Sequence, residues 1–365
     1  MGRERGDDGN VPNPQSLIPD PYSLIPSLCY NIPAAWIGFR PRRQDKSKST
    51  CPAPSARAGF SFSGRWASHS KEEIAVSETT STQDRKKVTT LTFLRKKSKN
   101  QPITMLTAYD YATALAIDRA GIDSILVGDS LGMVVLGYEN TLPVTMEDMI
   151  HHCKAVARGA HYALLIGDMP FMSYQASVDE AVQNAGRFLK EGGMDAVKLE
   201  GGRERLPAIE AIISAGIPVQ GHLGLTPQSV HLLGGFRAQG KTAVAARKLI
   251  EDAHALQDAG CFSLVLETIP ARLARVLSER LEIPTIGIGA GVGCDGQVLV
   301  THDLLGLFDR FTPRFVKKYV ELHNQMEEAF KAYRTDVETR AFPAEEHEVE
   351  MPDEEWEELI KELGT

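Results

Sequence analysis

Cysteine is scarce in this sequence, and the spacing of the few cysteines excludes several classes of protein. The five are Cys29, Cys51, Cys153, Cys261 and Cys294, and no two are spaced as C-x-x-C. An odd number of cysteines without paired spacing indicates a reducing compartment rather than a disulfide framework. The spacing gives no support for a metal site built from thiolates.

Long apolar runs are also absent. No run approaches the roughly 20 residues that a membrane-spanning helix needs, although 42% of the 365 residues are hydrophobic. A chain of this length and composition has enough apolar residues for a substantial core. We therefore expect a globular protein with no membrane partner.

Charge of one sign is missing from each end of the chain. Residues 21–70 hold seven Lys or Arg and one acid, Asp45, whereas residues 345–365 hold ten Asp or Glu and one base, Lys361. The formal net charge of -8 hides this asymmetry. Because the charge is concentrated in the ends, nothing in the middle of the chain predicts a nucleic-acid-binding face.

Residues 1–87 lack helical or strand periodicity, so we expect a disordered N-terminal extension. The stretch IGFRPRRQDKSKSTCPAPSARAGFSFSGRWASHS is basic, rich in serine and almost free of acids, a composition typical of a mitochondrial transit segment. We therefore expect a mitochondrial protein. A disordered tail without a targeting role is the alternative. Four acids argue against a transit segment that begins at Met1: Glu4, Asp7, Asp8 and Asp20.

Residues 335–365 form an acidic C-terminal extension. In DEEWEELIKEL, helical spacing relates Trp356, Leu359, Ile360 and Leu363, which is compatible with a short amphipathic helix. A solvated acidic tail is the main interpretation of this extension, and a docking helix is the alternative.

Between these ends, residues 88–334 alternate short apolar runs with amphipathic segments. Eight runs have strand character: PITMLTAY, SILVGDS, ALLIGDMP, DAVKLEG, PVQGHLG, SLVLETIP, PTIGIGAG and GQVLVTHD. Six segments have helix character: 110–120, 145–159, 177–191, 203–215, 241–259 and 271–280. The alternation indicates parallel strands, and eight such units in roughly 250 residues predict an α/β protein with a (β/α)8 TIM barrel. An open doubly wound sheet is the alternative.

Polar side chains end five consecutive predicted strands. They are Asp129 and Ser130, Asp168, Lys198 and Glu200, His222, and Glu267. Because the carboxyl ends of barrel strands converge on one mouth, we expect these side chains to line one site. Each of them alone also has a structural interpretation, as a turn former, a helix cap or one member of an ion pair.

Four carboxylates at one mouth would repel one another, so we expect positive charge among them. Lys198 supplies one cation, and a divalent metal is the natural second. Asp129, Asp168 and Glu200 are hard oxygen ligands that suit Mg²⁺, whereas zinc prefers His and Cys. A metal with open positions would chelate a 2-oxo acid and stabilise its enolate. Glu267 is then the base that removes the adjacent proton.

A glycine-rich segment, GIGAGVGCDG at 287–296, ends the seventh predicted strand. Loops after the seventh and eighth strands bind phosphate in many barrels. The segment is not a G-x-x-x-x-G-K-[ST] loop, and close packing of the backbone around a ligand explains it equally well.

Seven segments of the chain resemble the ketopantoate hydroxymethyltransferase family. They are TAYDY (107–111), VGDSLGMVVLG (127–137), GDMPFMSY (167–174), VKLEGG (197–202), GHLGLTPQSVHLLGGFRAQGK (221–241), LVLETIP (264–270) and IGIGAGVGCDGQVLVTHDLLG (286–306). The resemblance covers residues 88–334. It implies a barrel of the phosphoenolpyruvate-binding type and a Mg²⁺-dependent enzyme. The implied reaction transfers a hydroxymethyl group from 5,10-methylenetetrahydrofolate to 3-methyl-2-oxobutanoate, giving 2-dehydropantoate and tetrahydrofolate for pantothenate and coenzyme A synthesis.

The resemblance also implies roles for the residues at the strand ends. Asp129 and Asp168 would bind the metal, with Glu200 near it, directly or through water. Glu267 would accept the proton.

The remaining polar residues fall at substrate-binding positions of the family. Ser130 and Lys198 would hold the carboxylate and keto groups, beside the metal-binding Asp129 and Asp168. His222 also matches a site position of the family. The family in bacteria usually forms a decamer or a similar large assembly, so the resemblance implies a homo-oligomer whose other partners are the small keto acid and folate.

Two rival functions stay open at this point. A lyase of the same superfamily usually carries a catalytic cysteine in a KKCGH-like loop, but here Cys153 falls in a predicted helix and Cys294 in a glycine loop. A barrel that has lost its chemistry and serves as a binding scaffold would lack a metal ligand or the base, and all of these residues are present.

Overall fold

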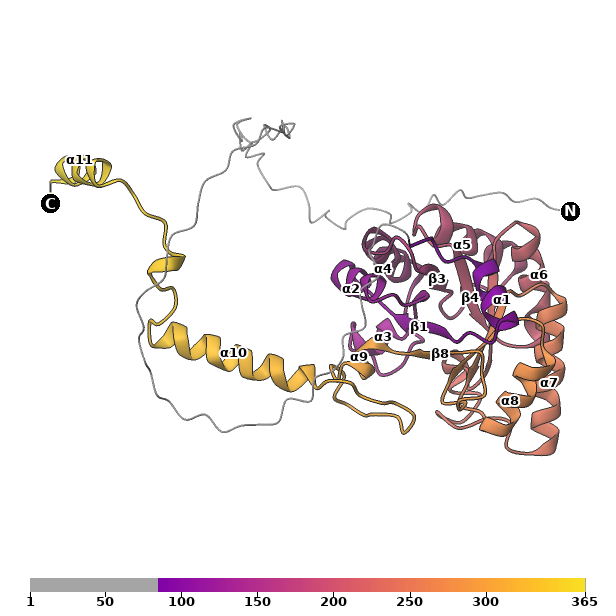
Figure 1. The fold of residues 1–365 in the computed structure, drawn as a ribbon. Coiled ribbons are helices and arrows are strands. Elements are labelled where there is room, and N and C mark those ends of the chain that lie inside the picture. Colours follow the sequence, from indigo (N-terminus) through magenta and orange to yellow (C-terminus); the bar gives the residue numbers. More distant parts are fainter. Residues whose placement is uncertain (1–84, 365) are drawn as a thin grey trace, which may run out of the picture. The chain divides into compact units, whose positions relative to one another are not determined.

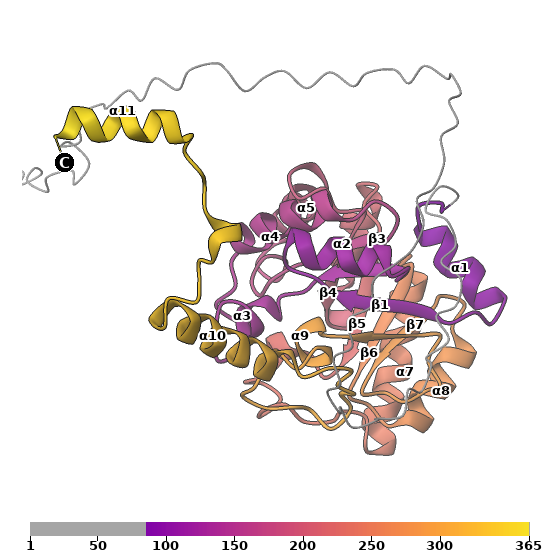
Figure 2. The same ribbon diagram turned by 60° about the vertical axis from the view of Figure 1, so that its left-hand side comes forward.

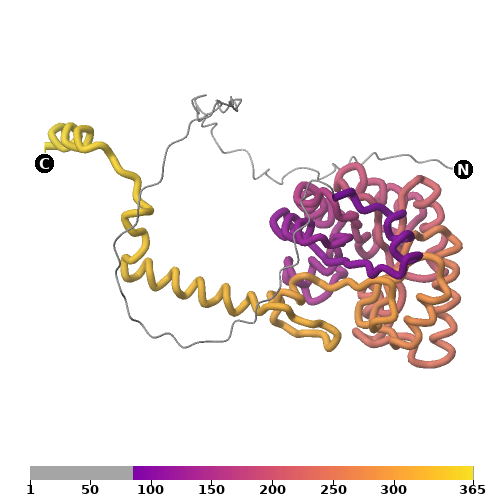
Figure 3. Tube along the Cα trace, in the orientation of Figure 1, coloured from indigo at the N-terminus to yellow at the C-terminus, as the bar shows by residue number. Residues whose placement is uncertain are grey.

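Eight parallel strands form a closed barrel in the computed structural model, which describes residues 85–364 (Figure 1). The strands pair in chain order and the last pairs with the first, so the indigo and orange segments run side by side in Figure 3. The strands are β1 Ile103–Thr107, β2 Ser124–Val127, β3 Leu164–Asp168, β4 Ala196–Glu200, β5 Val219–Gly224, β6 Ser263–Glu267, β7 Thr285–Ile288 and β8 Gly296–Leu299. Each lies within one predicted run, so the barrel prediction is confirmed and the open-sheet alternative is wrong.

Six helices connect the strands from β1 to β7 and surround the barrel (Figure 2). They are α2 Tyr111–Arg119, α4 Met146–Gly159, α5 Val178–Lys190, α6 Leu206–Ser214, α7 Ala243–Asp258 and α8 Ala271–Arg280, close to the predicted ranges. Shorter helical turns are α3 Leu131–Val134, α9 Thr301–Leu304, η1 Arg203–Arg205, η2 Pro227–Ser229 and η3 Glu345–His347. The start of α4 is a capping box, in which Thr145 and Asp148 each accept a backbone N–H of the other.

Alternation along each strand divides its side chains between two cores. In β4, Val197 and Leu199 belong to the apolar cluster between the strands and the helices. Ala196 belongs to the second cluster, which fills the barrel interior. Lys198 and Glu200 have the same parity as Ala196 and therefore point inward. Apolar residues and the hydrogen-bonded pair Gln220 and Ser263 fill the lower interior, and the inward charged groups gather at the carboxyl end of the barrel.

Helix α1 (Thr90–Ser98) packs against the amino-terminal end of the barrel. Its buried residue is Phe93, whose ring lies 5.9 Å from that of Phe262 in an edge-on contact. Phe93 belongs to the same cluster as Ile103 and Leu164 at the starts of their strands. The sequence pattern did not predict α1, because one buried side chain in nine residues leaves no helical periodicity.

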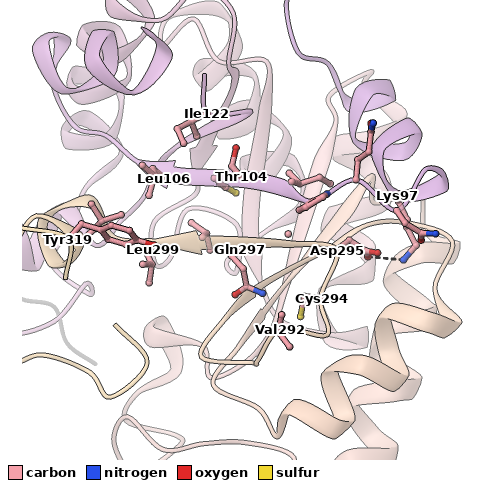
Figure 4. A pocket seen from close by; sticks show the side chains of 18 residues that line it. Lys97, Thr104, Leu106, Ile122, Val292, Cys294, Asp295, Gln297, Leu299 and Tyr319 are labelled. Atoms are coloured by element: carbon pink, nitrogen blue, oxygen red, sulfur yellow. Dashed lines mark hydrogen bonds and ion pairs between the residues drawn. The ribbon is translucent and has the colours of Figure 1, made fainter. Parts of the chain in front are cut away.

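The outer faces of β1 and β8 carry no long helix. In the described chain, a glycine loop rather than a helix connects β7 to β8, and α9 after β8 has four residues. Outward side chains such as Leu106 and Leu299 stay partly exposed, and a hollow of about 790 Å³ runs along both strands (Figure 4). Lys97 and Asp295 form a 2.8 Å ion pair in this hollow. The outer helix ring of the predicted (β/α)8 barrel is therefore incomplete here.

Two helices follow the barrel, α10 (Leu322–Glu338) and α11 (Asp353–Leu363), and neither has a buried residue. α11 is the helix that the spacing of Trp356 and its neighbours allows, and α10 crosses the predicted boundary at residue 334. The predicted N-terminal extension lies, apart from its last three residues, outside the described part of the chain. Within residues 85–364, every helix is too short or too polar to cross a membrane.

Candidate active site

All seven polar side chains predicted for the site line one cavity at the carboxyl end of the barrel. They are Asp129, Ser130, Asp168, Lys198, Glu200, His222 and Glu267. The cavity has a volume of about 350 Å³, within the range of small-molecule sites. Strand register brings them together, because Asp168 of β3 lies opposite Lys198 of β4, and Glu200 of β4 lies opposite His222 of β5.

Lys198 forms a buried ion pair with Asp168. Its Nζ lies 2.7 Å from Oδ1 of Asp168, and the two side chains are 5% and 2% exposed. Burial alone would lower the pKa of Lys198, but the charges of Asp168, Glu200 and Asp129 outweigh burial and raise it. The ammonium group therefore stays charged. The structure pairs Lys198 with Asp168 rather than with Glu200, its neighbour on the same face of the strand.

His222 lies between two carboxylates. Its Nδ1 is 3.5 Å from Oε1 of Glu200, and its Nε2 is 3.3 Å from Oε2 of Glu267. Burial and the charge of Lys198 act to lower the pKa of His222, but its hydrogen bonds to Glu200 and Glu267 outweigh them and raise it to about 9. The two carboxylates thus favour the protonated imidazole, whose Nδ1 also lies 3.3 Å from Nζ of Lys198.

Asp129 and Asp168 are buried against each other. The backbone N–H of Asp129 donates to Oδ2 of Asp168 at 3.2 Å. Burial is the main cause that raises the pKa of both carboxyl groups. The charges of Asp168 and Glu200 raise the pKa of Asp129 further, whereas Lys198 opposes the rise for both. Five carboxyl groups, counting Glu200, Glu267 and Asp303, thus line a cavity that holds one lysine and one histidine, so a further cation would offset their mutual repulsion.

Gln228 and Tyr174 hold these carboxylates in place. Gln228, in η2, donates from Nε2 to Oδ2 of Asp129 and to the carbonyl of Met169, both at 2.9 Å, and from its backbone N–H to Oε2 of Glu200 at 3.1 Å. The hydroxyl of Tyr174 accepts the N–H of Glu200 at 3.1 Å and donates to Oε1 of Gln228 at 2.7 Å. Sequence reasoning missed both residues, although both lie in segments that resemble the family.

Tyr109 is a third residue that sequence reasoning did not single out. Its hydroxyl lies 2.9 Å from Oγ of Ser130, and burial raises its pKa, so the phenol stays protonated. Nδ1 of His152 lies 2.6 Å from the backbone carbonyl of Tyr109. Ser130 begins α3 without a side-chain capping bond, so its hydroxyl is oriented by Tyr109 at the cavity wall.

Helix capping does not account for Asp129 or Glu267. The residue at the N-cap of α3 is Ser130, and the residue at the N-cap of α8 is Pro270. Neither helix start has a side-chain capping bond. Both carboxylates instead line the cavity.

The carboxylates provide hard oxygen donors for a cation. Within residues 85–364, no three His, Cys, Asp or Glu side chains are arranged to hold a metal ion by themselves. Asp129 and Asp168 nevertheless lie next to each other. Oδ1 of Asp129 has no hydrogen-bond partner in the described part of the chain. Mg²⁺ often takes one or two protein carboxylates and completes its shell with water and substrate. This donor set and the excess of carboxyl groups fit Mg²⁺.

A closed parallel barrel with buried acids, a lysine and a histidine at the carboxyl ends of its strands is the architecture of an α/β-barrel enzyme. The family model described as ketopantoate hydroxymethyltransferase matches residues 87–345. The chain belongs to this family, as the seven resembling segments predicted.

Curated relatives carry the name 3-methyl-2-oxobutanoate hydroxymethyltransferase. The protein of Syntrophus aciditrophicus is 58% identical over 268 residues, which cover 73% of this chain and 98% of that protein. The protein of Syntrophobacter fumaroxidans is 60% identical over 265 residues, which cover 73% and 94%. Among solved structures, a phosphonopyruvate hydrolase is similar with a TM-score of 0.49 at 12% identity, covering 76% of this chain and 95% of its own.

Proposed function

We propose that this chain transfers a hydroxymethyl group from 5,10-methylenetetrahydrofolate to 3-methyl-2-oxobutanoate, giving 2-dehydropantoate and tetrahydrofolate. Membership of the family supports hydroxymethyl transfer in general. The observation that carries the proposal is the 3.3 Å contact of Glu267 with His222, in the cavity that also holds Lys198. This arrangement places a proton acceptor beside a histidine and a lysine.

Asp129 and Asp168 are the residues that would hold Mg²⁺. Glu200 would lie outside the metal's direct ligands, because its Oε1 faces His222 and its Oε2 accepts a hydrogen bond from the backbone of Gln228. When bound, Mg²⁺ supplies a Lewis acid for the carbonyl of the keto acid.

Ser130 and Lys198 would hold the carboxylate and keto oxygens of the substrate. Lys198 donates to Asp168, and its Nζ also lies 3.3 Å from Nδ1 of His222, so the remaining N–H of its three would bind a ligand. The hydroxyl of Ser130 is oriented by Tyr109. Both groups lie at the carboxyl end of the barrel, Ser130 after β2 and Lys198 in β4, so they would hold the substrate at that end of the cavity.

Glu267 would remove the C3 proton of the keto acid. Its side chain is 16% exposed, whereas those of Asp168 and Glu200 are each 2% exposed, so Glu267 is more open to the cavity. His222 orients the carboxylate through its 3.3 Å contact. The ammonium group of Lys198 and the imidazole of His222 then stabilise the negative charge that develops on the keto oxygen. The resulting carbon nucleophile forms a C–C bond to the methylene carbon of the donor. The two C–N bonds of that carbon break, water supplies the hydroxyl oxygen, and the released protons go to the two folate nitrogens.

Proton exchange tests this assignment without the folate. The purified chain is incubated with 3-methyl-2-oxobutanoate and Mg²⁺ in D₂O, and the C3 proton signal is followed by NMR. We expect Glu267→Gln to bind the keto acid but to exchange at least about 100-fold more slowly, because general bases contribute about 10²–10⁴-fold. Glu282→Gln, at an exposed position before β7, is the control. Normal exchange in Glu267→Gln would move the base elsewhere.

The two rival functions have less support. Cys153 is buried in α4, and Cys294 lies in the loop before β8. Neither is among the residues that line the cavity, so a lyase with a catalytic cysteine finds no nucleophile there. A barrel without catalytic activity would not keep the proposed base and cation ligands together in one cavity.

We propose, from composition alone, that residues 1–87 direct the chain to mitochondria. Residues 1–87 fused to a fluorescent protein should colocalise with a mitochondrial marker, and a diffuse signal would contradict this. A chain without residues 1–85 should keep its exchange activity, because the described site lies wholly outside them.

We also propose that the chain assembles as a homo-oligomer. The hollow along β1 and β8 is largely apolar, and no helix within residues 85–364 covers it. α10 exposes Met326, Phe330, Tyr333 and Val337 along one face. A second copy would cover these surfaces. Phe330→Asp should lower the mass measured by light scattering, whereas Gln325→Asp on another face of α10 should not. An unchanged mass in Phe330→Asp would exclude α10 from the interface.

A further inference from the structure

Four aromatic rings also line the active-site cavity, and the keto-acid chemistry does not use them. The rings are Phe236, from the loop before α7, and Phe308, Phe311 and Phe315, from the segment after α9. Phe236 and Phe311 are 51% and 50% exposed, and the rings of Phe308 and Phe311 meet edge-on at 5.6 Å. Such rings at a cavity mouth offer flat apolar area to a ligand.

The aromatic segment is held in place by the rest of the barrel. Arg310 donates to the carbonyls of Gly137 and Tyr138 at 2.8 and 3.1 Å. The ring of Phe315 packs on Gly289, where a Cβ atom would lie 2.7 Å from a ring carbon. A side chain at position 289 would therefore displace the ring. These contacts hold the segment with Phe308, Phe311 and Phe315 in place before any ligand binds, which lowers the entropic cost of binding.

Asp303 is an unpaired carboxylate in the same cavity. It lies in α9, and its side chain has no ion pair or hydrogen bond within residues 85–364. Burial raises the pKa of Asp303 to about 6, and the charge of Lys318 opposes the rise. The charges of Asp303 and Asp129 both act on Tyr109, whose hydroxyl contacts Ser130. Asp303 therefore lies close to the proposed keto-acid site without taking part in its network.

We propose that Asp303 and the four phenylalanines bind the pterin ring of the one-carbon donor, an inference that rests on the proposed function. A reduced pterin has two flat faces and an edge on which N3–H and the 2-amino group lie side by side. A carboxylate accepts both of these hydrogen bonds, as it does from the paired N–H groups of arginine. Aromatic rings match the faces. The ring then lies next to the substrate held by Ser130.

The charge of the aromatic segment matches the rest of the donor. Residues 310–318, RFTPRFVKK, hold four basic residues and no acid, whereas the glutamate tail of a folate is anionic. A basic segment beside the cavity mouth attracts such a tail. The keto acid would thus bind among the polar side chains of the cavity, and the donor would bind against its aromatic side chains.

Binding of a non-reactive reduced folate tests this inference. The probe is 5-methyltetrahydrofolate, which carries no transferable methylene bridge, titrated calorimetrically into the full chain with 3-methyl-2-oxobutanoate and Mg²⁺ present. We expect Asp303→Asn to weaken binding by about tenfold or more, and Phe311→Leu to weaken it about threefold or more. Both variants should exchange the C3 proton of the keto acid within about twofold of the wild-type rate, because neither group is part of the exchange machinery.

The matched control is Asp309→Asn. Asp309 is an exposed carboxylate of the same segment, 3.7 Å from His323 and not part of the cavity lining, so its removal should leave probe binding unchanged. Wild-type affinity for the probe in Asp303→Asn would overturn the inference. So would equal losses of binding and exchange, which would indicate a structural role.

Failure of the proposed function gives a different result. A wild-type chain that binds the probe through Asp303 but does not exchange the C3 proton would remove the proposed reaction and leave the pterin site standing. A chain that exchanges the proton but does not bind the probe would overturn the pterin site and leave the keto-acid chemistry standing.

Discussion

Gln228 donates a 2.9 Å hydrogen bond to Asp129, although 99 residues separate them in the sequence. The same amide binds the carbonyl of Met169, and the backbone N–H of Gln228 binds Glu200. One residue of a short helical turn thus connects the carboxyl ends of β2, β3 and β4. β2 and β3 bring the proposed cation ligands Asp129 and Asp168 to the cavity, and β4 brings Lys198 and Glu200.

Replacing Gln228 with leucine should weaken cation binding more than it weakens the fold. The variant keeps the backbone bond to Glu200 but frees Asp129 to rotate and leaves the carbonyl of Met169 unpaired. A hydrogen bond to a charged group is worth about 1.5–3 kcal/mol, so we expect the Mg²⁺ concentration for half-maximal proton exchange to rise about 10- to 100-fold.

Magnesium titrations of the exchange rate measure this effect. Gln183→Leu, at an exposed position on α5, is the control and should titrate like the wild type. If Gln228→Leu needs no more Mg²⁺ than the control does, then Gln228 does not position a cation ligand.

Lys198→Met should destabilise the protein strongly in the absence of Mg²⁺. It leaves Asp168 buried beside Asp129 and Glu200 without its 2.7 Å partner. Removal of one member of a buried ion pair costs about 3–5 kcal/mol, measured as the free energy of unfolding in urea. Lys248→Met is the matched control, because Lys248 also pairs with a buried acid at 2.7 Å but is 63% exposed. Exposed pairs contribute about 0–1 kcal/mol. Equal losses in both variants would contradict a special role for the Lys198 pair.

The raised pKa of Asp303 predicts that the affinity for the folate donor falls at low pH. Its pKa in the folded chain, about 6, lies above the ordinary value of 3.8. The ionised form accepts both hydrogen bonds of the pterin edge, so affinity for 5-methyltetrahydrofolate should fall as the pH drops below about 6. The Lys318 charge and the Tyr109 hydroxyl are the titratable groups that act on Asp303 or respond to it.

The free energy of unfolding should depend on the ionisation of Asp303 in the opposite sense to donor affinity. A raised carboxyl pKa means that the folded chain holds a proton that the unfolded chain has lost between about pH 4 and 6. The contribution of Asp303 to the free energy of unfolding is therefore fully present below about pH 4 and is lost as the pH rises through about 6. Asp303→Asn should remove this dependence and flatten the affinity profile. A wild-type affinity that stays constant from about pH 8 to about pH 5 would contradict the assignment.

Phe93→Ala should destabilise the barrel without changing the site. Phe93 is fully buried against Phe262 at the amino-terminal end of the barrel, whereas the site lies at the carboxyl end. Truncation of a buried phenylalanine costs about 3–5 kcal/mol, measured by urea unfolding. Leu91→Ala, on the exposed side of the same helix, should change the unfolding free energy by less than about 0.5 kcal/mol. A small effect at Phe93 would mean that α1 contributes little to closing the barrel.

Local patterns predicted most of the regular structure. The eight strands and six connecting helices depend on the alternation and spacing of nearby apolar residues, which are visible along the chain. The unpredicted α1 has one buried contact, and the missing helix between β7 and β8 leaves no positive signal in a glycine-rich loop. The incomplete outer ring at β1 and β8 therefore became visible only when the elements were placed around the barrel.

The sequence by itself determined which side chains end the strands, and therefore that acids, a lysine and a histidine meet at one mouth. Only the tertiary structure decided how they pair. Lys198 binds Asp168 rather than Glu200, His222 lies between Glu200 and Glu267, and the carboxylates share one glutamine. Such pairings depend on strand register and burial across the barrel, and distances between residues far apart in the chain are not encoded in any local pattern.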